Sequence, residues 1–374
     1  MRRFGSLVIL AALVAACSGP ILANPTSSAP VIPTASPRPI ALPDPQPIVF
    51  PPADRAHDRL TEWWYYTGHL ADDVGGRWGF EFVIFRAERG SFPVTWASHV
   101  AVTDETAKTF VFAQRSEVGP QVDQSPANVG AFSLAIQGGP PNHGSTASPT
   151  WSMSNATGPD QLHATLDDGT SLDIALVATK PPTFHDHDGW IDFGPAGGSY
   201  YYSRTAMAAT GTLGVGAARS TVHGIAWFDH QWGDFISVGG GGWDWFAVNL
   251  DDGTDLTISL VRAADGSTPL VYGTLVDGSG HATHLDRTEF EVIADPARNW
   301  TSPATGATYP AGWTVHIPGE GLVIDLTPTV ANQELDTRAT TGVVYWEGSQ
   351  IVSATRNGVP VDGQAYVELT GYSP

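Results

Sequence analysis

Residues 63–70 read WWYYTGHL, and residues 243–250 read WDWFAVNL. Each stretch leads into an Asp- and Gly-containing turn and then into a second run of alternating apolar residues, which ends at Arg86 in one case and at Arg262 in the other. Alternation with a period of two is typical of β-strands. The matching residues of the two segments keep a constant spacing over several positions. This favours an internal duplication over a coincidence between two β-rich segments. The repeat predicts two similar β units side by side.

The composition agrees with an all-β fold. The chain has 374 residues, enough for about two domains, and it contains 41 Gly and 13 Trp. Turn signals recur at short intervals, for example at residues 72–76, 167–169 and 251–253. No convincing long amphipathic helix interrupts them. We therefore expect strands joined by tight turns, closed into barrels or stacked as sandwiches.

The charge balance excludes some classes of partner. Asp and Glu number 38 against 18 Lys and Arg, which gives a formal net charge of -20. Such a chain repels nucleic-acid phosphates and does not dock on anionic lipid by charge alone. We expect no nucleic-acid partner.

The N-terminus has the pattern of an export signal. Residues 1–16 combine a basic start, a short apolar run and small residues directly before Cys17, the only cysteine in the chain. This pattern resembles the lipobox of bacterial lipoproteins, which implies cleavage before Cys17 and lipidation of its thiol; the alternative is an ordinary signal peptide with a chance cysteine. Residues 18–49 are rich in Pro, Ser and Thr and are expected to form a linker. These features predict an extracytoplasmic, membrane-anchored lipoprotein.

Several aromatic-rich motifs carry a family resemblance. They lie at residues 62–68, 199–205, 227–233, 345–348 and 367–372. Together they resemble the lipocalin-like superfamily that includes carotenoid 1,2-hydratase (hydroxyneurosporene synthase) and the AttH-like proteins. The resemblance covers essentially everything after the linker. It implies two lipocalin-like β-barrel domains in tandem, at 50–215 and 216–374, with an apolar ligand site at or between them.

The resemblance also implies a candidate acid. Carotenoid 1,2-hydratases add water across a terminal double bond of an acyclic polyene, and their Tyr-x-Asp motif is matched here by Asp229, with Trp227 in place of the tyrosine. The resemblance places a His-x-Trp pair of that family at Tyr200 and Tyr202. The aspartate of the family motif is present in this chain, but the residues at the accompanying tyrosine, histidine and tryptophan positions differ. This difference leaves the exact reaction open.

Hydration of an isolated alkene needs a carboxylic acid that stays protonated. An apolar, aromatic pocket favours that state by raising the carboxyl pKa. We therefore take Asp229 as the candidate catalytic acid and Trp227, Trp232, Tyr200 and Tyr202 as the candidate aromatic wall that binds substrate and stabilises a carbocation. The structural alternative is that Asp229 belongs to a solvated turn or strand end at the rim of a barrel.

Three hypotheses follow for the function. The first is a lipid-anchored, cofactor-independent hydro-lyase that acts on a carotenoid or another apolar isoprenoid. The second is a non-catalytic lipocalin-like carrier of an apolar ligand. The third is a cyclase or isomerase that uses the same acid and aromatic pocket. The feature that separates them is whether Asp229 is buried beside a cavity with a raised pKa or is solvated and bonded to backbone.

Residues 185–188 read HDHD and form the one segment with metal-ligand character. Two histidines at i and i+2 on a strand share a face and can chelate zinc. The glycines that follow indicate a loop instead, and the sequence shows no evident third ligand. Fingerprints for phosphate loops, dinucleotides and the serine nucleophile elbow are missing as well. We therefore expect neither a metal nor a cofactor.

Overall fold

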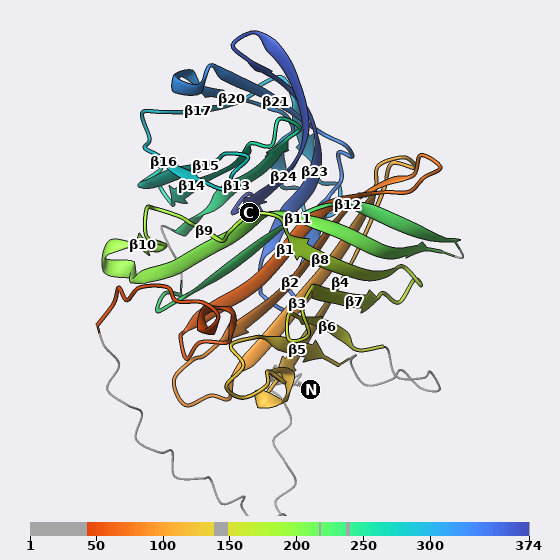
Figure 1. The fold of residues 1–374 in the computed structure, drawn as a ribbon, viewed down its shortest axis with the longest axis vertical. Coiled ribbons are helices and arrows are strands. Elements are labelled where there is room, and N and C mark those ends of the chain that lie inside the picture. Colours follow the sequence, from red (N-terminus) through yellow and green to blue (C-terminus); the bar gives the residue numbers. More distant parts are fainter. Residues whose placement is uncertain (1–42, 138–148, 217, 237–239, 374) are drawn as a thin grey trace, which may run out of the picture. The chain divides into compact units, whose positions relative to one another are not determined.

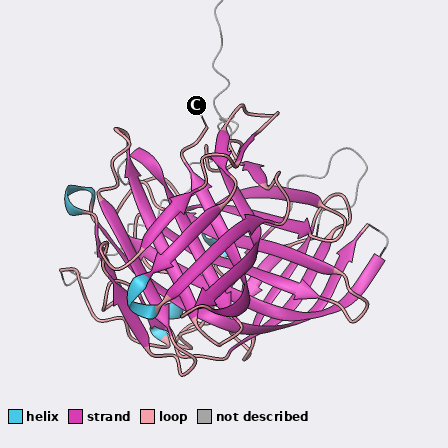
Figure 2. Cartoon of the chain, turned by 90° about the horizontal axis from the view of Figure 1, so that it is seen from above, coloured by secondary structure: helices cyan, strands magenta, loops and turns pink. Residues whose placement is uncertain are grey.

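The computed structural model describes residues 43–137, 149–216, 218–236 and 240–373. Cys17, the export signal and most of the expected linker lie outside these residues. A single unit begins at Pro47, and it is built almost wholly of strands (Figure 2). In the described part of the chain the helical elements are short 3-10 turns: η1 (Pro52–Asp54), η2 (Pro120–Val122), η3 (Gly194–Ala196) and η4 (Pro318–Glu320).

The first sheet has twelve antiparallel strands (Figure 1). They are β1 (Thr61–Ala71), β2 (Arg77–Ala87), β3 (Thr95–Asp104), β4 (Thr109–Val118), β5 (Ser133–Ile136), β6 (Trp151–Ser154), β7 (Asp160–Thr165), β8 (Ser171–Ala178), β9 (Thr183–Phe184), β10 (Trp190–Asp192), β11 (Gly198–Val215) and β12 (Ala218–Gly233). Their order is β4-β3-β2-β1-β12-β11-β8-β7-β6-β5, with β9 and β10 both paired to β11. The sheet curls so that β4 approaches β5 at the far end of this order.

The second sheet has ten strands. They are β13 (Gly240–Leu250), β14 (Asp255–Ala263), β15 (Leu270–Val276), β16 (Ala282–Leu285), β17 (Glu291–Ala294), β20 (Trp313–Ile317), β21 (Leu322–Pro328), β22 (Glu334–Asp336), β23 (Val344–Arg356) and β24 (Val359–Thr370). Their order is β16-β15-β14-β13-β24-β23-β21-β20-β17, and β22 pairs with β23. A separate two-stranded sheet joins β18 (Asn299–Thr301) to β19 (Thr308–Pro310). The prediction of an all-β protein with two barrel-like domains is confirmed.

The internal duplication is confirmed by the pairing of the strands. The run β4-β3-β2-β1-β12-β11 in the first sheet corresponds to β16-β15-β14-β13-β24-β23 in the second. Residues matched in the repeat also pair alike, because Tyr66 lies opposite Phe82 and Phe246 lies opposite Ile258. Each half therefore begins with a meander and closes it with its last strand.

The boundary expected between residues 215 and 216 is wrong. β12 pairs with both β1 and β11 and so belongs to the first sheet, and the chain passes to the second sheet only after Gly233. Gly216, at φ +57°, begins the tight turn of the β11–β12 hairpin. Such a turn requires a positive φ, and its glycine signals a hairpin, not a domain linker. The first domain also begins slightly earlier than expected, since Ile48 packs on its core.

Two kinds of core hold the unit together. Each sheet encloses its own apolar interior, with Trp64 and Phe82 in the first and Trp313 and Val367 in the second. A third cluster lies where the outer faces of the two sheets meet. It is formed by Tyr65, Val83, Trp227, Trp245, Ala247 and Tyr366. Burial of each large side chain is worth roughly 1.5–3 kcal/mol, so this cluster binds the halves firmly together.

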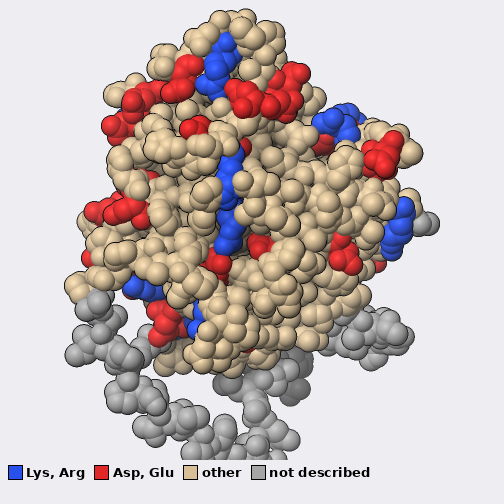
Figure 3. Space-filling view, viewed as in Figure 1, with Lys and Arg blue, Asp and Glu red and all other residues tan. Residues whose placement is uncertain are grey.

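The surface in Figure 3 carries scattered charges on a largely uncharged background. This agrees with a sequence in which only 15% of residues are charged. Within the described ranges, the structure contains no helix of the length and apolar character that a membrane crossing needs.

A buried ion pair ties the two sheets together. Lys180, just after β8, lies with its Nζ 2.7 Å from Oδ2 of Asp255 on β14, and the two side chains are 8% and 3% exposed. Asp255 also accepts hydrogen bonds from Thr205 and Asn249. Loss of the cation leaves a buried carboxylate short of its charge partner, which is costly.

We predict that Lys180→Met lowers the free energy of unfolding by about 3 kcal/mol, measured by urea denaturation. Arg338→Met is the matched control, because its ion pair with Asp336 is 59% and 38% exposed, so solvent screens it and its loss should change the free energy of unfolding far less. Equal losses for the two variants would show that burial does not strengthen the Lys180 pair.

Candidate functional site

The alternation of β12 decides which residues meet between the sheets. Side chains of successive strand residues point to opposite faces. Trp227 contributes to the cluster between the sheets, and Asp229 lies on the same face. Phe228 and Trp232 instead point into the interior of the first sheet.

This alternation corrects the expected aromatic wall. Asp229 and Trp227 are brought together, whereas Tyr200, Tyr202 and Trp232 belong to the first core on the opposite face. The residues of β11 that do face the acid are Tyr201 and Ser203, because both side chains donate hydrogen bonds to Asp229. A shift of one residue along a strand exchanges its two faces, and the sequence of three consecutive tyrosines contains no signal that separates them.

Asp229 is 3% exposed and accepts hydrogen bonds from three side chains. The Tyr201 hydroxyl donates to Oδ2 at 2.5 Å, the Trp227 indole N–H donates to Oδ1 at 2.6 Å, and the Ser203 hydroxyl also donates to Oδ1. Burial raises the pKa of Asp229 to about 6, although the three donors act in the opposite direction. The group is thus buried and held by side chains, not solvated at a rim.

A second layer orients these donors. Nε2 of His185 lies 2.6 Å from the Ser203 hydroxyl, and Nδ1 of His185 lies 3.0 Å from the Thr274 hydroxyl of β15. The Trp245 indole of β13 donates to the Tyr201 hydroxyl at 3.1 Å. Burial lowers the pKa of His185 to about 3, so the ring is neutral and can donate through one nitrogen while accepting through the other. Both sheets therefore hold the carboxyl in place.

Further carboxyl groups lie in the same zone, within the motifs at residues 345–348 and 367–372, and are additional to the site residues expected from the sequence. Glu347 of β23 is 1% exposed and accepts a hydrogen bond of 2.8 Å from the Tyr65 hydroxyl. Its backbone pairs with Glu368 of β24, which is less deeply buried. Burial, followed by the charges of neighbouring carboxylates, raises the pKa of Glu347 well above its usual range. Burial raises the pKa of Glu368 to about 7.

Glu81 of β2 completes this acidic zone. Its Oε1 accepts a hydrogen bond of 2.8 Å from Tyr345, and its Oε2 is buried without a hydrogen-bond partner among the described residues. Nδ1 of His99 lies 2.8 Å from the same Tyr345 hydroxyl. Burial raises the pKa of Glu81 to about 8. A buried carboxyl with one oxygen free of hydrogen bonds and a pKa above neutral pH is a candidate for chemistry.

Asp229 and Glu368 occupy equivalent places in the duplicated halves. Tyr65 of β1 lies opposite Asp229, and Trp245, its counterpart in the repeat, lies opposite Glu368. The charge of Asp229 also raises the pKa of Glu368. The carboxyl groups thus come from matching positions of two sheets that face each other.

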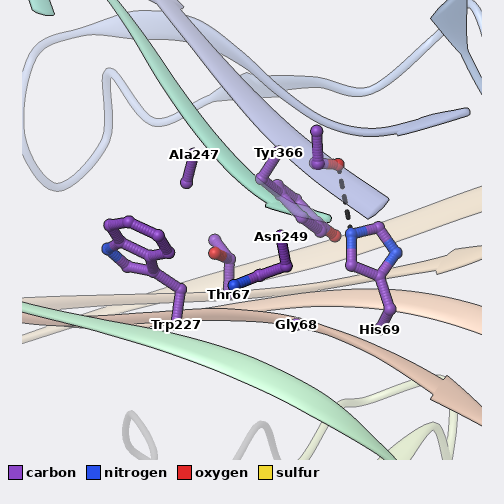
Figure 4. Close-up of a pocket in the computed structure, with 8 residues that line it drawn as sticks. Thr67, Gly68, His69, Trp227, Ala247, Asn249 and Tyr366 are labelled. Atoms are coloured by element: carbon purple, nitrogen blue, oxygen red, sulfur yellow. Dashed lines mark hydrogen bonds between the residues drawn. The ribbon is translucent and has the colours of Figure 1, made fainter. Parts of the chain in front are cut away.

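A small pocket lies between the sheets beside this zone (Figure 4). It has a volume of about 10 Å³ and is lined by Thr67, Gly68, His69, Trp227, Ala247, Asn249, Ala365 and Tyr366. This space is about the size of one water molecule. Trp227 connects the two features, because its ring lines the pocket while its N–H holds Asp229.

A larger pocket of about 280 Å³ is lined in part by Glu105, which contacts His69. Charged and polar residues line it, including Arg77, Glu105 and Lys108. Nδ1 of His69 lies 3.4 Å from Oε1 of Glu105, and its Nε2 lies 3.1 Å from the carbonyl oxygen of Ala365. His69 therefore stands between the two pockets.

The arrangement separates the protonation states of two acids. At neutral pH a carboxyl with a pKa of about 6 is mostly ionised, as Asp229 is, whereas burial and the neighbouring carboxylates raise the pKa of Glu347 well above its usual range and so favour its protonated form. Pairs of groups whose pKa values are pushed apart by their surroundings are typical of acid–base catalysis. The zone is suited to reactions that remove one proton and supply another.

The fold and the site define a class: a two-domain, lipocalin-like protein with buried acids between its halves. The chain belongs to the AttH-like family, whose profile matches residues 41–372. It is similar to a crystal structure named for AttH from Nitrosomonas europaea, with 28% identity, a TM-score of 0.73 and coverage of 89% of this chain and 99% of that one. The predicted family resemblance is confirmed at this level.

Two further relatives carry enzyme names. The dehydratase asqC of Emericella nidulans is 28% identical over 172 residues, which span 44% of this chain and about half, 47%, of that protein. Kievitone hydratase from Nectria haematococca has a similar fold, with a TM-score of 0.66, 16% identity and coverage of 87% and 93% of the two chains. The narrower expectation of a carotenoid substrate stays a prediction.

The raised pKa of Glu81 predicts a dependence of stability on pH. A carboxyl that binds its proton more tightly when folded stabilises the fold at low pH, and this contribution is lost as the pH rises through the folded pKa of about 8. We expect Glu81→Gln to lose less stability than the unmodified chain between pH 5 and 9, by on the order of 3 kcal/mol, measured by denaturation at each pH.

Asp295→Asn is the control for this measurement. The pKa of the partly exposed Asp295 is lowered by hydrogen bonds from Ala297 and Arg298, so it stays ionised over this pH range. Its variant should follow the unmodified profile. A Glu81→Gln profile that also follows it would mean that Glu81 titrates normally.

Proposed function

We propose that this protein is a cofactor-independent hydro-lyase that adds or removes water across a carbon–carbon double bond. The observation that supports this most strongly is Asp229, a buried carboxyl with a raised pKa held by three side-chain donors. The hydratase and dehydratase names of two relatives point the same way. A positioned acid or base contributes roughly 10²–10⁴-fold to the rate of such a reaction.

The protonation states suggest which of the two acids accepts a proton and which donates one. In the direction of water loss, the Asp229 carboxylate takes a proton from carbon while the Glu347 carboxylic acid protonates the departing hydroxyl. The C–H and C–O bonds break, the double bond forms and one water leaves. After this step Asp229 is protonated and Glu347 is ionised. Glu347 must regain a proton, and Asp229 must lose one, before the next turnover. Hydration is the reverse, with Asp229 as the acid that protonates the alkene.

The surroundings favour an apolar substrate. Trp227, Trp245 and Tyr65 surround the acids with aromatic rings, which can stabilise a developing cation. A carotenoid with an acyclic end or a smaller isoprenoid remains the first substrate class to test. The water-sized pocket at Trp227 does not hold a hydrocarbon chain, so substrate must displace side chains between the sheets.

The test compares the full chain with Asp229→Asn on acyclic carotenoids, simpler isoprenoid alkenes and their tertiary alcohols. Mass spectrometry follows the gain or loss of one water. We expect Asp229→Asn to slow turnover by about 10²-fold or more. Tight binding of these compounds without turnover, equal in both proteins, would overturn the proposal of an enzyme and favour the alternative of a lipocalin-like carrier.

Asp244→Asn is the matched control variant. Asp244 is also a buried carboxyl whose pKa is raised by burial to about 6, but it is held by Arg262 and Tyr372 and does not line the pocket beside Asp229. We expect this variant to keep its activity. A similar loss in both variants would indicate a general effect of removing buried charge.

We also propose that the protein is anchored outside the cytoplasm through lipidated Cys17. The support is the sequence before Cys17, with its basic start and apolar run. In a bacterial host, we expect labelled palmitate to be incorporated into the unmodified chain and recovered in the membrane fraction. Cys17→Ser should abolish the labelling and release the protein, and labelling that persists would exclude this cysteine as the acceptor.

A further inference from the structure

The HDHD segment does not form the pair of ligands that the sequence suggested. His185 points inward to Ser203, whereas His187 is exposed in the loop between β9 and β10. The loop turns sharply because Asp186 and His187 adopt left-handed backbone angles, with φ values of 47° and 72°. Such a conformation is unfavourable for non-glycine residues, and two in succession often mark a functional site.

The third ligand that the sequence lacked comes from the other sheet. His284 of β16 lies beside this loop, and Figure 1 places β9, β10 and β16 on the same side of the molecule. The rings of His187 and His284 have centroids 4.2 Å apart. One ligand atom from each of Asp186, His187 and His284 falls within 4.8 Å of the others.

The distances around His284 fit a metal better than a hydrogen bond. Its Nε2 lies 3.6 Å from Oδ1 of Asp186 and 3.4 Å from Oδ1 of Asp286. Both separations are long for an N–H···O hydrogen bond. They are close to about 3.3 Å, the edge of a tetrahedron of ligands around zinc at 2.0–2.1 Å. Asp286 is 78% exposed and can act as a second carboxylate ligand.

A second group of possible ligands shows the opposite pattern. His57, Glu62 and His230 also lie together. Oε1 of Glu62 is 2.7 Å from His57 Nδ1 and 3.0 Å from His230 Nε2, and the backbone N–H of His57 donates to Oε2 at 2.9 Å. These are ordinary hydrogen bonds, and they satisfy the buried carboxylate without a metal.

The ring of His284, in contrast, is not fully hydrogen-bonded. Its Nδ1 is buried and has no hydrogen-bond partner among the described residues. The ring is therefore held by its neighbours and by two carboxylates, with no hydrogen bond at Nδ1 to fix it. A cation between the rings and the carboxylates would neutralise the acidic charge and fix the ring.

We propose that Asp186, His187 and His284 form a site for a borderline divalent cation such as Zn²⁺, with Asp286 as the second carboxylate. Two imidazoles and one or two carboxylates suit zinc and its neighbours in the transition series. Asp186 is 37% exposed at its side chain, so a position remains open to solvent. The expectation of no metal, drawn from the sequence, is thereby revised.

The site joins the two sheets next to the catalytic network. Asp186 and His187 directly follow His185, whose ring lies against Ser203 of the first sheet and Thr274 of the second. A bound cation would attach this loop to β16 and so fix the ring that supports Ser203. The binding proposal itself does not depend on the enzyme proposal.

The test is a titration of the untagged, chelator-treated full chain with ZnCl₂, followed by calorimetry. We expect one equivalent to bind and to raise the melting temperature. Co²⁺ in place of zinc should show the intense visible absorption of a tetrahedral site. His187→Ala and His284→Ala should each weaken binding by about tenfold or more. His187 is exposed, so its variant stays informative even if His284→Ala fails to fold.

Two control variants make the result specific. His163 is an exposed histidine 3.9 Å from Asp173, a comparable pair elsewhere on the surface, and His163→Ala should bind zinc as the unmodified chain does. His57→Ala should also leave binding unchanged. Binding lost in His57→Ala but kept in His187→Ala would place the metal inside the first sheet and overturn the proposal. The absence of stoichiometric binding to the unmodified chain would overturn it as well.

Discussion

The transfer of acidic side chains from water into the contact between two sheets is the constraint on which the rest depends. Burial is the largest influence on the pKa of Asp229, Glu81 and Glu347, and it favours the protonated form of each. The aromatic cluster between the sheets excludes water and so creates this effect. The same packing holds the halves together and surrounds the acids, which means that the stability of the fold and the candidate site depend on one interface.

Much of the fold could be predicted because it rests on local patterns. Period-two alternation and Gly-rich turns indicate strands, and the repeat of residues 63–70 at 243–250 indicates the duplication. The domain boundary could not be found in this way. A glycine turn inside a long hairpin and a turn between domains have the same composition, and only the pairing of β12 with β1 separates them.

The site was only partly predictable, for a related reason. Asp229 and Trp227 lie two residues apart, so any strand places them on one face. Tyr201 stands between two other tyrosines, and its choice over Tyr200 depends on the register of β11 against β12. Glu347 and His284 come from the other sheet. Contacts made across the two sheets leave no spacing in the sequence by which to recognise them.

The equivalence of Asp229 and Glu368 has a consequence for how the two acids became different. If the halves were two identical chains facing each other, a twofold axis would give both acids the same donors and the same affinity for protons. Fusion into one chain removes that requirement. Tyr201, Ser203 and Trp227 then serve one carboxyl alone, while Glu347 stands opposite its counterpart. Broken symmetry thus allows the two matched carboxyls to have different hydrogen-bond donors and different affinities for protons.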